Sequence, residues 1–195
     1  MIGNIEIIAE AKEKSPWFKF PYKRDYLLDI AIDIGDMISI PTGQEWGGSL
    51  VHITETRKRT DKPILAKNIH PKDRDLEMAF DAGATYGLVV GRIPADKYLG
   101  RCMIEPSSLE QLLQIPNDVM VVWNQRDIIQ SLKLGYEVRQ KGTFQEARAI
   151  FDGWLCQASY LKTIEDIKKG ADAVLVGTNL VGFATSIGYK IKELK

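Results

Sequence analysis

Two lysines and two glutamates stand at or just after the ends of short apolar runs. Glu10 and Lys12 close the first run, Lys67 follows the third, and Glu105 ends the fifth. Residues two apart on a strand share a face, so we expect Glu10 and Lys12 to be neighbours. In a pocket shielded from water, such groups set one another's pKa values and can supply a general acid and a general base. Rim ion pairs explain any one of these residues well, but all four together poorly.

Eight apolar runs rich in Ile and Val alternate with segments of helical spacing, which is typical of a parallel α/β architecture. The runs are Ile5–Ala11, Met37–Ile40, Pro63–Ala66, Tyr86–Val90, Cys102–Glu105, Val119–Trp123, Trp154–Gln157 and Ala173–Val176. They number eight and are apolar throughout, and no G-x-G-x-x-G follows the first. This favours a closed (β/α)8 TIM barrel over an open doubly wound sheet. Active sites of such barrels lie at the carboxyl ends of the strands, so the four charged residues are predicted to converge on one mouth.

Helical spacing between the runs predicts the outer layer of the barrel. The predicted helices are Tyr22–Ile34, Ser49–Arg59, Lys72–Ala82, Ser107–Gln114, Phe144–Phe151, Leu161–Lys169 and a stretch around Ile187–Leu194. The fourth connection, Gly91–Arg101, is too short and too interrupted by Pro94 and Gly100 for a full crossover helix. Ile128–Gly142 is predicted to be an irregular loop over one face. A barrel of 195 residues is shortened relative to the usual length of about 250.

Composition limits the classes of partner. The chain has 26 basic and 26 acidic residues, so a broad electrostatic footprint for nucleic acid is not expected. No stretch is apolar enough to span a membrane, and a cytoplasmic single-domain protein over residues 1–195 is the default expectation. Cys102 and Cys156 lie in apolar runs and are predicted to be buried thiols. No metal-ligand spacing is present, no cofactor is expected, and the sequence leaves monomer or homo-oligomer open.

Two further segments suggest a ligand. Gly177-Thr178 follows the eighth run, where barrels often bind phosphate, and the glycine permits close backbone approach. A capping turn is the equally weighted alternative. Trp46, just after the second run, is either a stacking platform for an aromatic ligand or a hydrophobic plug. A phosphorylated small molecule is therefore the expected partner.

Several strand-end motifs resemble those of indole-3-glycerol phosphate synthase, a (β/α)8 enzyme of tryptophan biosynthesis. The segment from Ala9 to Pro16 is similar to A-E-x-K-x-x-S-P, and the segment from Trp46 to Leu50 to F-G-G-S-L. The segment from Pro63 to Lys67 is similar to P-[IV]-L-x-K, and that from Trp123 to Asp127 to I-N-x-R-[DN]. Glu105 falls where the family has V-E or I-E. The resemblance runs over essentially the whole chain in order and spacing.

The resemblance implies a carbon–carbon lyase that closes the indole ring of 1-(2-carboxyphenylamino)-1-deoxyribulose 5-phosphate with loss of CO₂ and water. Lys67 would be the general acid, Lys12 would bind anionic groups and share in proton transfer, and Glu105 and Glu10 would hold the lysines and act as base. Asn124 and Arg126 would contact the substrate. Ser15, Gly177 and Thr178 would bind phosphate, and Trp46 would line the anthranilate pocket.

The chain also departs from that family. The family has E-S-G-I after strand seven, where this chain has Gln157-Ala158-Ser159-Tyr160, so a carboxylate and a serine are predicted to be missing from the pocket. The family's N-terminal extension is also expected to be lacking. Two alternatives stay open: a diverged paralogue that acts on or binds another phosphorylated sugar, and a non-catalytic barrel that serves as a binding or assembly partner.

Overall fold

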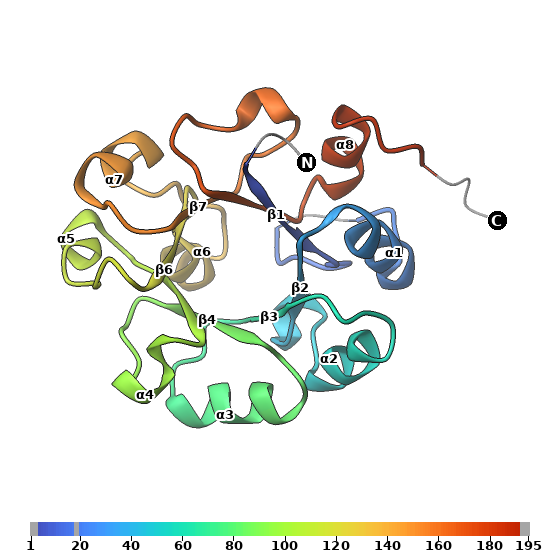
Figure 1. Cartoon of the computed structure of the whole chain (residues 1–195), viewed down its shortest axis with the longest axis horizontal. Coiled ribbons are helices and arrows are strands. Elements are labelled where there is room, and N and C mark those ends of the chain that lie inside the picture. Colours follow the sequence, from blue (N-terminus) through green and yellow to red (C-terminus); the bar gives the residue numbers. More distant parts are fainter. Residues whose placement is uncertain (1–3, 18–19, 192–195) are drawn as a thin grey trace.

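All eight predicted apolar runs form strands in the computed structural model, which describes residues 4–17 and 20–191. The strands are β1 (Glu6–Glu10), β2 (Met37–Pro41), β3 (Ile64–Lys67), β4 (Tyr86–Val90), β5 (Cys102–Glu105), β6 (Met120–Asn124), β7 (Leu155–Ala158) and β8 (Ala173–Val176). Each pairs in parallel with the next, and β8 pairs with β1, which closes the barrel (Figure 1). The predicted (β/α)8 TIM barrel is confirmed.

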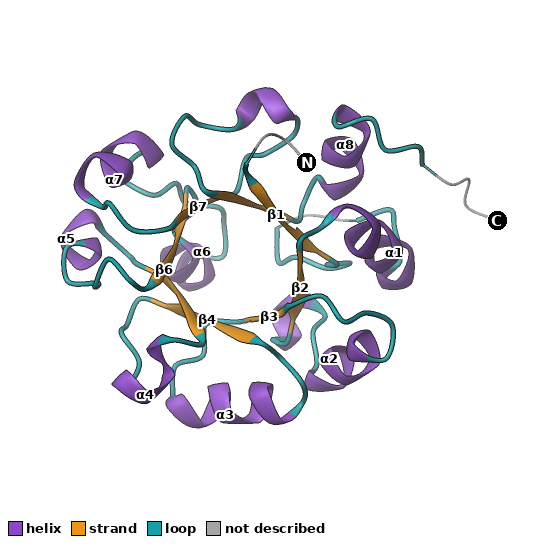
Figure 2. Ribbon diagram, viewed as in Figure 1, coloured by secondary structure: helices purple, strands orange, loops and turns teal. Residues whose placement is uncertain are grey.

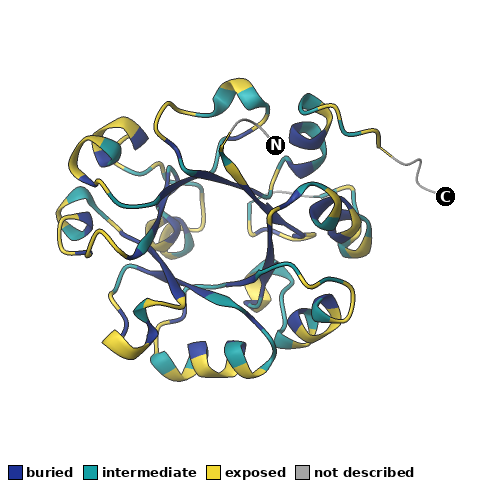
Figure 3. Ribbon diagram, in the orientation of Figure 1, coloured by how far each residue is buried: buried dark blue, intermediate teal, exposed yellow. Residues whose placement is uncertain are grey.

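Most helices surround the strands on the outside of the ring, whereas α6 (Ile128–Leu134) projects inside the ring in this view (Figure 2). The helices are α1 (Arg24–Ile34), α2 (Leu50–Arg57), α3 (Asp73–Asp81), α4 (Asp96–Leu99), α5 (Leu109–Leu112), α6 (Ile128–Leu134), α7 (Phe144–Ile150) and α8 (Leu180–Ser186), with short 3-10 turns η1 (Gln44–Trp46) and η2 (Ile164–Asp166). The strands are buried, whereas the helices are exposed on their outer faces (Figure 3).

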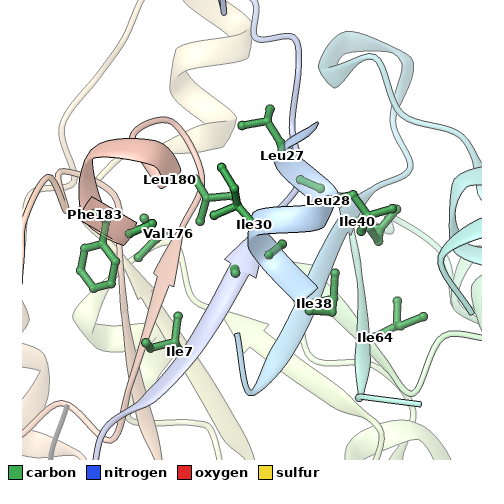
Figure 4. Packing of buried hydrophobic residues seen from close by; sticks show 14 of the residues in the cluster. Ile7, Leu27, Leu28, Ile30, Ile38, Ile40, Ile64, Val176, Leu180 and Phe183 are labelled. Atoms are coloured by element: carbon green, nitrogen blue, oxygen red, sulfur yellow. The ribbon is translucent and has the colours of Figure 1, made fainter. Parts of the chain in front are cut away.

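The two faces of each strand have different neighbours. Ile7 and Ile38 face outward and pack with Leu28 of α1 and Phe183 of α8 (Figure 4). Ile8 belongs instead to the cluster that fills the barrel interior, together with residues from several other strands. Burying each such side chain contributes about 1.5–3 kcal/mol, so alternation along β1 is strongly fixed.

The same alternation places a charged side chain at the mouth of the barrel. Glu10 lies two residues beyond Ile8 and so shares its inward face, at the carboxyl end of β1. The register pairs Glu10 with Ser39 of β2 and Ala9 with Val176 of β8. The position of Glu10 is therefore set by strand pairing on both sides.

Two irregular connections were predicted, and the structure confirms one. The fourth crossover contains only the four residues of α4. The prediction of an irregular loop over Ile128–Gly142 is wrong in its first half, which forms α6. Asp127 Oδ1 caps this helix by accepting a hydrogen bond from the N–H of Gln130, and Gly135, at φ 76°, ends it.

Two predicted helices are also wrong. Leu161–Lys169 contains only η2, because Asp166 folds back to accept hydrogen bonds from the N–H groups of Lys162 and Thr163. The predicted helix around Ile187–Leu194 is replaced by α8, which begins at Leu180 and is followed by Gly188 at φ 83°. Residues 192–195 of that prediction lie outside the described residues.

Both cysteines are free and buried, as predicted, and burial raises the pKa of the Cys102 thiol to about 11. In the described part of the chain, no helix is long and apolar enough to cross a membrane. The assignment of residues 1–195 to a single domain stays a prediction.

Candidate active site

Glu10 binds two lysines at the mouth of the barrel. Its Oε2 lies 2.9 Å from Nζ of Lys12, and its Oε1 lies 3.3 Å from Nζ of Lys67. The side chains of Glu10 and Lys12 are only 2% and 5% exposed, whereas that of Lys67 is 19% exposed. The predicted convergence of these three residues is confirmed, and Lys67 is the lysine more open to a ligand.

One carboxylate cannot neutralise two ammonium groups. Burial alone would raise the pKa of Glu10, but the charges of Lys12 and Lys67 outweigh it and lower the pKa to about 2. Burial lowers the pKa of Lys12, and the charge of Lys67 lowers it further against the attraction of Glu10. The cluster therefore holds an excess of positive charge in a place of low solvent access.

Glu105 has the opposite character. Its Oε1 accepts a hydrogen bond of 3.1 Å from Nδ2 of Asn124, while its Oε2 is buried and has no hydrogen-bond partner among the described residues. Burial raises the pKa of Glu105 to about 7, although Lys67 and the bond from Asn124 act in the other direction. A carboxyl group with this pKa is divided between its acid and base forms at neutral pH, which suits proton transfer.

Asn124 is held from two sides, so its amide has a fixed orientation. Its Oδ1 accepts hydrogen bonds from Oγ of Ser159 at 2.6 Å and from the backbone N–H of Arg126 at 3.0 Å. The prediction that a serine is missing from the end of β7 is therefore wrong, because Ser159 supplies one. Ser159 has a left-handed backbone, at φ 67°, and this geometry was not foreseen from the sequence.

Glu10, the two lysines and Ser159 border a cavity of about 230 Å³ at the carboxyl ends of β1, β3, β6, β7 and β8, whereas Glu105 and Asn124 are not among its described lining residues. Its lining residues are Glu10, Lys12, Lys67, Arg126, Glu137, Ala158, Ser159, Tyr160, Leu161, Lys162, Leu175, Val176, Gly177, Thr178 and Asn179. Four of them are cationic and two are anionic, which leaves an excess of two positive charges. A smaller hollow beside it is lined by Trp46 and Glu105, and Glu10 and Lys67 border both.

Gly177 has a role that its sequence context does not predict. A Cβ at this position would stand 1.9 Å from Oε2 of Glu10, so a side chain cannot fit while Glu10 keeps its place. Thr178 lines the cavity next to it. The predicted contact of this turn with phosphate stays a prediction.

Trp46 and Ser15 lie around Lys12. The ring of Trp46 is 5.7 Å from Nζ of Lys12 and packs edge to face with Trp17 at 5.3 Å. Buried Ser15 accepts a hydrogen bond from the N–H of Trp17 and is not among the described residues that line the cavity. Its proposed contact with phosphate also stays a prediction.

Three functional candidates were missed by sequence reasoning: Glu137, Tyr160 and Lys162. Glu137 lies in the segment predicted to be irregular, yet its carboxylate forms an ion pair with Arg126 on the wall of the cavity. Tyr160, at φ 56°, and Lys162 follow β7. No sequence motif marks these three residues, because their positions in the structure depend on how the loops after β6 and β7 pack together.

A larger hollow of about 860 Å³ lies outside the mouth, between α5, α6, α7 and residues 138–142. The ionisable side chains along it, such as those of Glu110, Arg139 and Lys141, are exposed. Water screens such groups, so they hold the charge of a ligand only weakly. The chemistry is therefore better assigned to the smaller cavity at the strand ends.

Comparison with solved structures gives the same architecture. A crystal structure of 3-hexulose-6-phosphate synthase superposes with a TM-score of 0.62 at 16% identity, covering 95% of this chain and 96% of that one. The enzyme from Salmonella typhimurium gives a TM-score of 0.67 at 17% identity, covering 95% and 94%. This chain shares their fold. No family model matches the sequence.

These neighbours correct the resemblance to indole-3-glycerol phosphate synthase. The structures found to be similar are those of 3-hexulose-6-phosphate synthase, a different barrel enzyme, and no family model supports the motif match. The indole ring closure, the carbon–carbon lyase assignment and the place in tryptophan biosynthesis are therefore withdrawn. Short strand-end motifs misled because charged and glycine residues at these positions serve any barrel with a site at its mouth.

Proposed function

We propose that this chain binds a phosphorylated ketose and moves a proton on the carbon next to its carbonyl group. The proposal corresponds to the alternative of a barrel that acts on another phosphorylated sugar. The titles of the structural neighbours name an enzyme of a hexulose phosphate, which is a ketose phosphate, and this is consistent with the proposal.

One observation carries the proposal: a cavity with two excess positive charges opens beside a buried carboxyl group whose pKa is about 7. A phosphate monoester brings close to two negative charges and so balances the excess. Glu105 then lies near the carbon atoms of a ligand whose phosphate is bound in the cavity. Neither feature alone distinguishes a catalytic site from a binding site, but together they supply both binding and proton transfer.

The residues take the following roles in this proposal. Glu105 removes the proton from carbon through Oε2, the one of its two carboxyl oxygens that accepts no hydrogen bond from the described part of the chain. Lys67, the more exposed lysine, stabilises the oxygen on which negative charge develops. Asn124 binds a sugar hydroxyl. Lys12, with the Gly177-Thr178 turn, holds the phosphate.

Exchange of carbon-bound hydrogen in D₂O tests the proposal. The protein is incubated with D-ribulose 5-phosphate or D-fructose 6-phosphate, and loss of the proton next to the carbonyl is followed by NMR. We expect exchange that disappears in Glu105→Gln and is absent with D-ribulose or D-fructose, which lack the phosphate. Binding of these phosphates in calorimetry without exchange would overturn the catalytic part and favour a binding barrel. No binding of either ketose phosphate would overturn the whole proposal.

A further inference from the structure

A carboxylate of the protein itself is held as a bound anion would be, on the wall of the cavity. Oε2 of Glu137 accepts hydrogen bonds from Nε of Arg126 at 3.0 Å and pairs with its Nη2 at 2.8 Å. Oε1 of Glu137 accepts a hydrogen bond from the hydroxyl of Tyr160 at 2.6 Å. Both carboxylate oxygens are therefore satisfied by donors that also line the cavity.

One of the two donors, Arg126, is more buried than the carboxylate that it binds. Arg126 is 8% exposed, and its guanidinium carbon lies 5.5 Å from the ring centre of Tyr160 and 5.6 Å from that of Trp17. Glu137 is 27% exposed. A buried guanidinium that faces a more exposed carboxylate is the arrangement expected of a site from which the acceptor can be exchanged.

The backbone of Glu137 need not move for this exchange. The N–H of Asp127 donates to the carbonyl of Val138 at 2.9 Å, and the N–H of Gln140 donates to the carbonyl of Gln125 at 2.9 Å. These bonds flank an antiparallel bridge between Arg126 and Arg139. The segment is therefore tied to the end of β6, and only the Glu137 side chain has to rotate toward solvent.

We propose that Arg126 and Tyr160 form a carboxylate-binding position that the side chain of Glu137 fills in the ligand-free protein. A ligand with a phosphate at one end and a carboxylate at the other displaces Glu137 and takes over its three donors. This inference rests on the proposed function for the phosphate end and adds to it that phosphorylated sugars with a second acid group are the preferred ligands. Glu137 is then a built-in competitor for the carboxylate end of the ligand, whereas a ligand that carries only a phosphate binds beside it without displacing it.

Calorimetry with three probes tests this position. 6-Phospho-D-gluconate carries both groups, D-glucitol 6-phosphate carries only the phosphate, and D-gluconate carries only the carboxylate. In Glu137→Gln the competing charge is lost, so we expect both carboxylate probes to bind about tenfold tighter or more, while D-glucitol 6-phosphate changes about threefold or less. Glu110→Gln, an exposed carboxylate on α5, is the matched control and should leave all three affinities unchanged.

Tyr160→Phe provides a second, independent variant, which keeps the ring and removes the hydroxyl. It should weaken binding of 6-phospho-D-gluconate and D-gluconate but not of D-glucitol 6-phosphate. Equal changes for both phosphorylated probes in Glu137→Gln, or unchanged binding of the carboxylate probes, would overturn the inference. D-Gluconate carries no phosphate, so its binding tests the carboxylate-binding position by itself. Failure of D-glucitol 6-phosphate to bind would therefore count against the proposed function alone.

Discussion

The carboxylate of Glu10 occupies the space that a side chain on Gly177 would need. A Cβ on residue 177 would stand 1.9 Å from Oε2 of Glu10, which is the oxygen that pairs with Lys12. The end of β8 thus fixes the ion pair at the end of β1. Because Glu10 also contacts Lys67, this single close approach positions both lysines.

Gly177→Ala should therefore disturb the site more than the fold. The new methyl group forces Glu10 to turn away, so we expect hydrogen exchange on ketose phosphates to fall about 100-fold, the size of effect typical of lost positioning. Gly100→Ala is the control, because no atom of the described residues lies within 4 Å of a Cβ there, and the activity of this variant should match that of the natural chain. Comparable loss of activity in both variants would show that Glu10 is not the cause.

Lys67→Met should reduce exchange about 100-fold or more, since general acid–base or charge-stabilising groups contribute about 10²–10⁴-fold. The phosphate contacts remain, so the dissociation constant measured by calorimetry should change far less than the rate. Lys97→Met, on the outer surface with a side chain 69% exposed, is the matched control. A loss of rate fully explained by weaker binding would remove Lys67 from the chemistry.

Glu105 should make the protein less stable as pH rises. The carboxyl group of Glu105 has a pKa of about 7 in the folded chain and 4.5 as the reference value. Between these values the unfolded chain has lost the proton that the folded chain retains, so unfolding becomes easier with rising pH. The contribution amounts to about 3 kcal/mol across this window and is constant above it.

The measurement is urea unfolding of the natural chain and Glu105→Gln from pH 4.5 to 8. Glutamine does not titrate, so the stability of the variant relative to the natural chain should rise between pH 4.5 and 7 and then level off. A difference that is independent of pH would show that Glu105 ionises in the folded chain at its ordinary pKa.

Trp123→Ala should be among the most destabilising substitutions outside the site. Trp123 is fully buried, and its Nε1 donates a hydrogen bond of 3.3 Å to the carbonyl of Gly142. Removal of the indole leaves a cavity and frees the segment above it, at a cost of about 3–5 kcal/mol. Tyr136→Ala, 59% exposed, should change the free energy of unfolding by about 0.5 kcal/mol or less in the same urea titration.

The strands were predictable because burial on both faces gives each of them a continuous apolar run. Predicted and observed strand ends agree within about one residue, for example Met37–Ile40 against Met37–Pro41. Alternation along β1 likewise predicted the pair of Glu10 and Lys12. These features depend on local sequence and on strand periodicity, which a sequence displays directly.

Helix ends were harder to predict, because side chains and glycines decide them. Asp166 turns the predicted helix after β7 into one 3-10 turn, and Gly188 lies where a further helix was expected. Glu137 and Tyr160 could not be foreseen for another reason. They meet Arg126 only because two loops from different crossovers converge over the mouth, and such tertiary contacts have no periodic signal.

The family resemblance was wrong about the reaction, not about where the strand-end residues lie. The strand-end lysines and glutamates were located correctly, but the reaction was taken from short motifs. Sites at a barrel mouth draw on a small set of residue types, so similar motifs recur among barrels of different function.

The pairing of β1 with both β2 and β8 also determines when the site can assemble while the chain is being synthesised. β1 leaves the ribosome first of the eight strands, whereas β8 leaves last, so one edge of β1 stays without its hydrogen-bonded neighbour until the barrel sequence is complete. Gly177, whose missing side chain leaves room for the carboxylate of Glu10, follows β8. The nascent chain therefore carries both lysines and their shared glutamate early but assembles them into a site only at the end.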